Sequence, residues 1–134
     1  MEIFEVFETA EKITVYNQGD TIQYTAGSKP YSEILQCWYS MTEVAHDMPA
    51  YGVSLNRETV KALKSGLWVE FDFGKRLEVN GLPFEKLLIG VEREFYGFNL
   101  VRYNAENGYD GRCFYFDLNG KNMSDLYNLL LNIR

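Results

Sequence analysis

The sequence predicts an α+β fold, in which one antiparallel β-sheet packs against about three helices. Two observations carry this prediction. Apolar residues recur at helical spacing between Pro30 and Pro49, and again near the C-terminus. Alternation of apolar and polar residues, typical of half-buried strands, fills much of the chain from residue 67 to residue 118. The length of 134 residues suits a single domain spanning positions 1–134.

An N-terminal hairpin is expected within the first 25 residues. In residues 1–10 glutamate recurs at every third position, which fits a helix, but the Ile, Phe and Val content favours a strand. We expect a strand here, because the segments that follow look like its partners. Residues 13–16 and 21–25 form the predicted hairpin, joined by the four-residue loop NQGD.

Residues 28–49 carry the clearest helical signal. Ser28 or Ser32 can cap the helix, and Pro49 ends it. Its apolar stripe consists of Tyr31, Ile34, Leu35, Trp38, Met41, Ala45 and Met48. A second, shorter helix is expected to begin at Asn56 as its N-cap and to end before Gly66.

The remainder of the chain predicts a meander and a closing helix. Strands at 67–73 and 76–79 are followed by Asn80-Gly81, the strongest short hairpin signal, and by a strand within residues 84–92. Two further strands, 97–103 and 112–118, flank the loop NAENGYDG. Asn119-Gly120 then turns the chain into a last helix, capped by Asn122.

The net charge of −6 lies entirely in the first part of the chain. Residues 1–50 hold eight acids and two lysines, whereas residues 51–134 hold eleven residues of each sign. A phosphate backbone would be repelled by the acidic part, so direct binding of nucleic acid is disfavoured. A basic protein partner would be attracted.

Several classes of site and location are disfavoured by what the sequence lacks. The longest apolar runs are far shorter than a membrane span of roughly 20 residues, and the N-terminus has no basic region typical of a signal peptide. We therefore expect a cytoplasmic protein. Cys37 and Cys113 are expected to be free thiols. No zinc-ligand spacing, phosphate-binding loop or other cofactor motif occurs, so no metal or cofactor is predicted.

The stretch WVEFDF offers the first candidate site. Alternation on a strand sends Trp68, Glu70 and Asp72 to one face, with the two acids roughly 7 Å apart along the strand. The simplest interpretation is the solvated side of a sheet. On a second strand, treated as a neighbour, Tyr115 and Asp117 face outward. If these outer faces align, the five residues form an acidic, aromatic binding patch.

Two hypotheses follow from these residues. The first is a small, acidic, non-catalytic binding protein, such as an inhibitor or an immunity-type factor, that engages a basic protein partner. The second is a small-molecule-binding protein or enzyme with a pocket between the sheet and the helix at residues 31–48, using Glu70 and Asp72. The sequence favours binding over catalysis, because the spacing of Cys37 and His46 on one predicted helix does not allow a catalytic dyad. An edge strand or the apolar face of the last helix could also support a homodimer.

Overall fold

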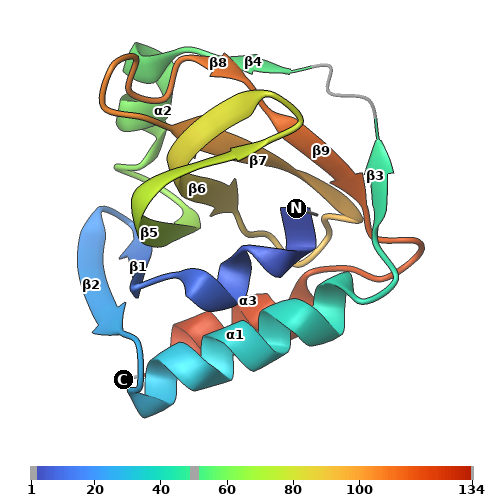
Figure 1. Cartoon of the computed structure of the whole chain (residues 1–134). Helices are drawn as coiled ribbons and strands as arrows, with labels where there is room; N and C mark the ends of the chain where they lie inside the picture. Colours follow the sequence, from blue (N-terminus) through green and yellow to red (C-terminus); the bar gives the residue numbers. More distant parts are fainter. Residues whose placement is uncertain (1–2, 49–51, 134) are drawn as a thin grey trace.

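The computed structural model describes residues 3–48 and 52–133, which form an α+β fold (Figure 1). Seven strands form an antiparallel sheet in the order β2-β1-β5-β6-β7-β9-β3, and β4 and β8 pair separately. The strands are β1 (Lys12–Asn17), β2 (Asp20–Thr25), β3 (His46–Met48), β4 (Val53–Ser54), β5 (Leu67–Val79), β6 (Leu82–Gly90), β7 (Gly97–Tyr103), β8 (Gly111–Arg112) and β9 (Phe114–Asp117). The helices are the 3₁₀-helices η1 (Ile3–Glu5) and η2 (Phe7–Thr9) and the α-helices α1 (Lys29–Thr42), α2 (Asn56–Ala62) and α3 (Ser124–Asn132).

The N-terminal segment forms η1 and η2, so the strand predicted for residues 1–10 was wrong for its described part. The helical spacing of the apolar residues outweighs their β-propensity here. Ile3, Val6, Phe7 and Ala10 are all buried. The Phe7 ring lies 4.8 Å from the ring of Trp38, so the segment packs on the core instead of extending the sheet.

The predicted N-terminal hairpin is present as β1 and β2, but its loop is shorter than expected. Asn17 pairs with Asp20, which leaves Gln18 and Gly19 as a two-residue turn. Both turn residues have positive φ angles, 51° and 91°. This backbone suits the right-handed twist of the flanking strands. The Asn80-Gly81 turn between β5 and β6 has the same signs of φ, as its sequence predicts.

Helix α1 begins as predicted and ends earlier. The Ser28 hydroxyl accepts the backbone N–H of Tyr31 and caps the helix. The helix ends at Thr42, and His46–Met48 pair with β9 as strand β3. The prediction of one helix through residue 48 was wrong because pairing at the edge of the sheet satisfies this backbone instead.

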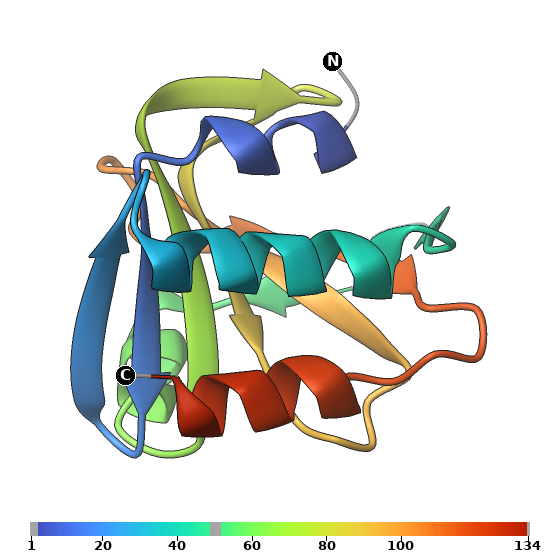
Figure 2. The same ribbon diagram turned by 90° about the horizontal axis from the view of Figure 1, so that it is seen from below.

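Helices α1 and α3 lie side by side over one face of the sheet (Figure 2). Helix α2 and the β4–β8 pair lie on the other side of it (Figure 1). We call the face of the sheet under α1 and α3 the helix face, and the opposite face the outer face. Aromatic rings fill the space under α1, where Trp38 lies 5.2 Å from both Phe71 and Phe98. None of the helices in the described residues combines the length and the apolar character needed to cross a membrane.

Candidate functional site: an aromatic groove on the outer face

Strand β5 alternates as its sequence predicts. Val69, Phe71 and Phe73 are buried in the core. Glu70, on the intervening outer side of the strand, contacts Tyr16 and Tyr109. Glu70 therefore projects away from the space between the sheet and residues 31–48, where the predicted pocket would use it.

Glu70 is a buried carboxylate held by two phenols. Its side chain is 1% exposed. The Tyr16 hydroxyl donates to Oε1 at 2.8 Å, and the Tyr109 hydroxyl donates to Oε2 at 2.6 Å. Burial, followed by the repulsion from the Glu70 charge, raises the pKa of both tyrosines above their ordinary value. Both phenols therefore stay protonated and available as donors at neutral pH.

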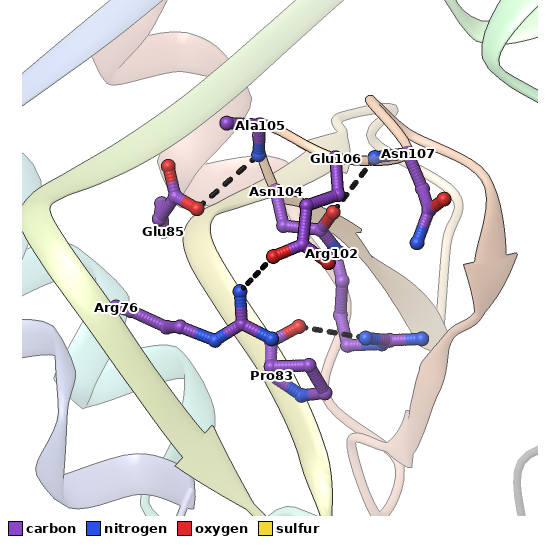
Figure 3. A network of polar contacts seen from close by, with 8 residues as sticks. All are labelled: Arg76, Pro83, Glu85, Arg102, Asn104, Ala105, Glu106 and Asn107. Atoms are coloured by element: carbon purple, nitrogen blue, oxygen red, sulfur yellow. Dashed lines mark hydrogen bonds and ion pairs between the residues drawn. The ribbon is translucent and has the colours of Figure 1, made fainter.

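Tyr109 reaches Glu70 from the loop between β7 and β8, and polar contacts attach this loop to the β5–β6 hairpin (Figure 3). Arg76 forms an ion pair with Glu106 at 2.8 Å. The carboxylate of Glu85 accepts the backbone N–H of Ala105 at 3.2 Å. The loop therefore covers Glu70 and removes it from the accessible part of the outer face.

Arg102, on β7, connects the strands next to this loop. Its side chain is buried, and its Nη1 and Nε donate to the backbone carbonyls of Pro83 and Arg112, each at 2.7 Å (Figure 3 shows the first contact). Two strong charge-assisted hydrogen bonds thus join β6, β7 and β8. The helix α2 is fixed to the loop as well, because the Asn56 side chain accepts the backbone N–H of Tyr109 at 3.0 Å instead of capping its own helix.

Asp72 also takes part in local contacts. Its carboxylate lies 3.8 Å from the ammonium of Lys12 and accepts the backbone N–H of Gly74 at 3.0 Å. Glu70 is thus buried, whereas the Asp72 side chain keeps 16% of its surface exposed. The five predicted patch residues do not form one continuous surface.

Trp68 and Tyr115 border the same cavity, although their strands are not neighbours. Trp68 pairs with Gly90 on β6, and Tyr115 pairs with Asn99 on β7. Since β6 and β7 lie between β5 and β9, these residues form a row across four strands, about 14 Å long at the usual strand spacing. Trp68 and Tyr115 line one cavity of about 300 Å³.

The floor of this cavity contains two glycines. A Cβ on Gly90 would lie 3.2 Å from the indole of Trp68, so the ring lies directly over this position. A Cβ on Gly97 would lie 2.7 Å from the carbonyl oxygen of Phe116 and 3.2 Å from the Tyr115 hydroxyl. The absence of side chains at both positions opens the space that the aromatic rings border.

A second cavity, of about 260 Å³, adjoins the first at Trp68. Trp68, Gly90 and Phe95 line both cavities. We call the two cavities together the aromatic groove. Its first part, the Tyr115 compartment, is also lined by Gly97, Phe98, Asn99, Val101 and Tyr115. Its second part, the Glu92 compartment, is also lined by Ala62, Ser65, Gly66, Leu67, Val91 and Glu92.

Carboxylates border the aromatic groove. Glu92 lines the second compartment. It belongs to the loop between β6 and β7, in which Glu94 is also exposed. Within residues 3–48 and 52–133, no ion pair involves either of them. Arg93, between them, turns toward helix α3, where its guanidinium lies 4.7 Å from the ring of Tyr127. Asp117 lies beside the groove, paired with Gly97.

The sequence interpretation missed Phe95 and the two floor glycines. Phe95 is 40% exposed in a loop between strands, and an aromatic residue amid the charged residues of "VEREFYG" was the available signal. Glycine inside a strand, as at Gly90, is a known sign of close approach by another group. The tyrosine partners of Glu70 had no such local signal.

Potential metal and thiol chemistry is limited in the described part of the chain. No group of three or more His, Cys, Asp or Glu side chains there is arranged to hold a metal ion. Cys37 and Cys113 are free thiols, and burial raises the pKa of each. A raised pKa disfavours the reactive thiolate.

The comparisons with known proteins found no relationship that identifies a family. No family model, curated protein or solved structure matches this chain.

Proposed function

We propose that this chain is a non-catalytic binding protein that engages a basic segment of a partner protein in the aromatic groove. The observation that carries the proposal is the convergence of Trp68, Phe95 and Tyr115 on a glycine-floored groove that Glu92 also lines, with no ion pair to Glu92 among the described residues. Large aromatic residues at the centre and charged residues at the rim are the usual arrangement of protein interfaces.

The negative charge of this chain supports the proposal that its partner is basic. The whole chain carries a net charge of −6, which attracts a basic protein over a distance. Glu92 and Glu94 place negative charge next to the groove, and Arg93 is held against Tyr127. A protein that binds over the basic functional surface of its partner would act as an inhibitor or as an immunity-type factor.

Phe95 and Tyr96 provide a matched pair of variants for the test. Both are exposed aromatic residues of one loop, at 40% and 56%, but only Phe95 lines the groove. Phe95→Ala therefore removes a wall of the groove, and Tyr96→Ala removes a neighbouring aromatic side chain from outside it. Neither substitution empties the buried core, so both variants are expected to fold.

The experiment captures partners from native lysate on wild type, Phe95→Ala and Tyr96→Ala, each washed at low and at raised salt. A basic protein retained by wild type and Tyr96→Ala, lost with Phe95→Ala and weakened by salt is the expected result. Retention that is equal on all three proteins, or no retained basic protein, would contradict the proposal.

A further inference from the structure

We infer that the aromatic groove accepts an extended segment, with a large apolar side chain in the Tyr115 compartment and a lysine or arginine in the Glu92 compartment. This inference rests on the proposed function and adds the kind of sequence that the groove selects. It follows from the different lining of the two compartments and from the position of Trp68, which lines both.

The Tyr115 compartment suits an apolar side chain. Its cavity of about 300 Å³ is lined by aromatic and aliphatic groups and by glycine backbone, and none of the described residues that line it is charged. The Asn99 amide and the Tyr115 hydroxyl are the polar side-chain groups at its border. An aromatic or large aliphatic residue would exchange water for contact with these rings, and an unpaired charge there would lose hydration without compensation.

The Glu92 compartment suits a cation. Its cavity of about 260 Å³ is lined by the acidic residue Glu92, together with Trp68. A lysine or arginine in this space has a carboxylate to pair with and an aromatic face to stack on. The long aliphatic part of either side chain would contact the apolar remainder of the lining.

Trp68 lines both compartments and is held in place. Its indole N–H donates to the carbonyl of Ser65 at 2.9 Å, and its six-membered ring lies over Gly90. Side chains two residues apart on an extended segment point to one side and are separated by about 7 Å. Two such side chains can therefore enter the two adjoining compartments, while the segment crosses above the indole. A wall that is fixed before binding lowers the entropic cost of association.

The test uses short synthetic peptides of glycine and serine that carry one phenylalanine and one arginine. In the parent peptide a single serine separates the two residues. In three further peptides, alanine replaces the phenylalanine, glutamine replaces the arginine, or five residues separate the pair. Calorimetric titration of wild type with the four peptides should rank the parent first. Loss of the phenylalanine is expected to weaken binding about tenfold or more, and loss of the arginine about threefold to fivefold.

A double-mutant cycle assigns the arginine to its compartment. Glu92→Gln should weaken binding of the parent peptide by the same threefold to fivefold factor and leave the peptide with glutamine unaffected. Glu33→Gln, an acid on helix α1 on the helix face, is the control and should alter neither affinity. Equal effects of Glu92→Gln on both peptides would overturn the assignment of the arginine.

The peptide experiment tests the two-side-chain binding mode, and the lysate experiment tests the proposed function, so one can be contradicted without the other. If wild type binds the four peptides equally or none of them, while a basic protein is still captured in a Phe95-dependent way, the two-side-chain mode is wrong and the proposed function stands. If the captured protein does not depend on Phe95, the proposed function fails. Selective peptide binding that persists unchanged in Phe95→Ala would place the peptide elsewhere and would overturn the inference.

Discussion

The Tyr109 hydroxyl donates a 2.6 Å hydrogen bond to the buried carboxylate of Glu70, and this contact joins the β7–β8 loop to the centre of the sheet. The Tyr16 hydroxyl donates to the other carboxylate oxygen. Glu70, which the sequence predicted to lie on a binding surface, is thus buried and connects Tyr16 to Tyr109. It divides the outer face into a covered part and the open aromatic groove.

Replacement of Glu70 is therefore expected to lower stability. Glu70→Ala leaves the buried Tyr109 phenol and the half-buried Tyr16 phenol without their acceptor, which should reduce the free energy of unfolding by about 2–4 kcal/mol. Glu78→Ala, an exposed glutamate farther along β5, should change it by less than about 0.5 kcal/mol. Urea unfolding of the three proteins checks this. Equal midpoints for Glu70→Ala and Glu78→Ala would show that the buried cluster does not stabilise the fold.

The raised pKa of Tyr109 predicts loss of stability at high pH. Below pH of about 10 the phenol is protonated in both folded and unfolded chains, so its contribution is constant. Above that pH the unfolded chain loses the proton first, and the free energy of unfolding should fall by up to about 1.4 kcal/mol per pH unit.

Tyr109→Phe isolates this contribution, since the other titrating groups are common to both proteins. The difference in unfolding free energy between wild type and Tyr109→Phe should stay level from neutral pH to about pH 10 and shrink above it. Urea unfolding across this pH range provides the measurement. A difference that grows with rising pH would contradict the raised pKa.

Arg102 and Arg76 are expected to contribute very differently to the attachment of the loop. Arg102 is buried and satisfies the carbonyls of Pro83 and Arg112, so Arg102→Leu should cost about 2–4 kcal/mol. The exposed Arg76–Glu106 ion pair should contribute less than about 1 kcal/mol, and Arg76→Ala tests it. Thermal unfolding compares the two variants. A similar loss for both would mean that burial does not decide the contribution.

Gly90→Ala is expected to change the groove more than the fold. The added methyl group would lie 3.2 Å from the Trp68 indole, so the ring must move by a few tenths of an ångström. The fluorescence of Trp68 and the affinity for a partner should both change, with a stability loss of about 1 kcal/mol.

The Trp68→Ala background controls for this contact. Without the indole, the additional Gly90→Ala substitution should have little effect on partner affinity, because the neighbour that must move is gone. An equal loss of affinity in both backgrounds would show that Gly90 acts on binding independently of Trp68.

Local signals predicted much of the fold. The Asn80-Gly81 turn, the Ser28 cap and the alternation along β5 depend on neighbours in sequence, and the structure has all three. The end of α1 and the N-terminal helices depend on tertiary contacts, with the edge of β9 and with Trp38, so they were misassigned. Propensity is a weak guide where packing decides.

The candidate site was only partly predictable for the same reason. Alternation predicts which way Trp68 and Tyr115 face, but strand order determines what lies between them, and strand pairing is set by contacts distant in sequence. The burial of Glu70 depends on Tyr109, which is 39 residues away along the chain. No local pattern in WVEFDF distinguishes a buried acid from an exposed one.

Site-specific photo-crosslinking can show whether a basic partner binds in the aromatic groove. Benzoylphenylalanine would replace Phe95 in the groove in one protein and Glu33 on helix α1 in another, and both proteins would be irradiated in native lysate. We expect a basic protein to be crosslinked from position 95 and not from position 33. Crosslinking of that protein from position 33 alone, or equally from both positions, would contradict binding in the aromatic groove.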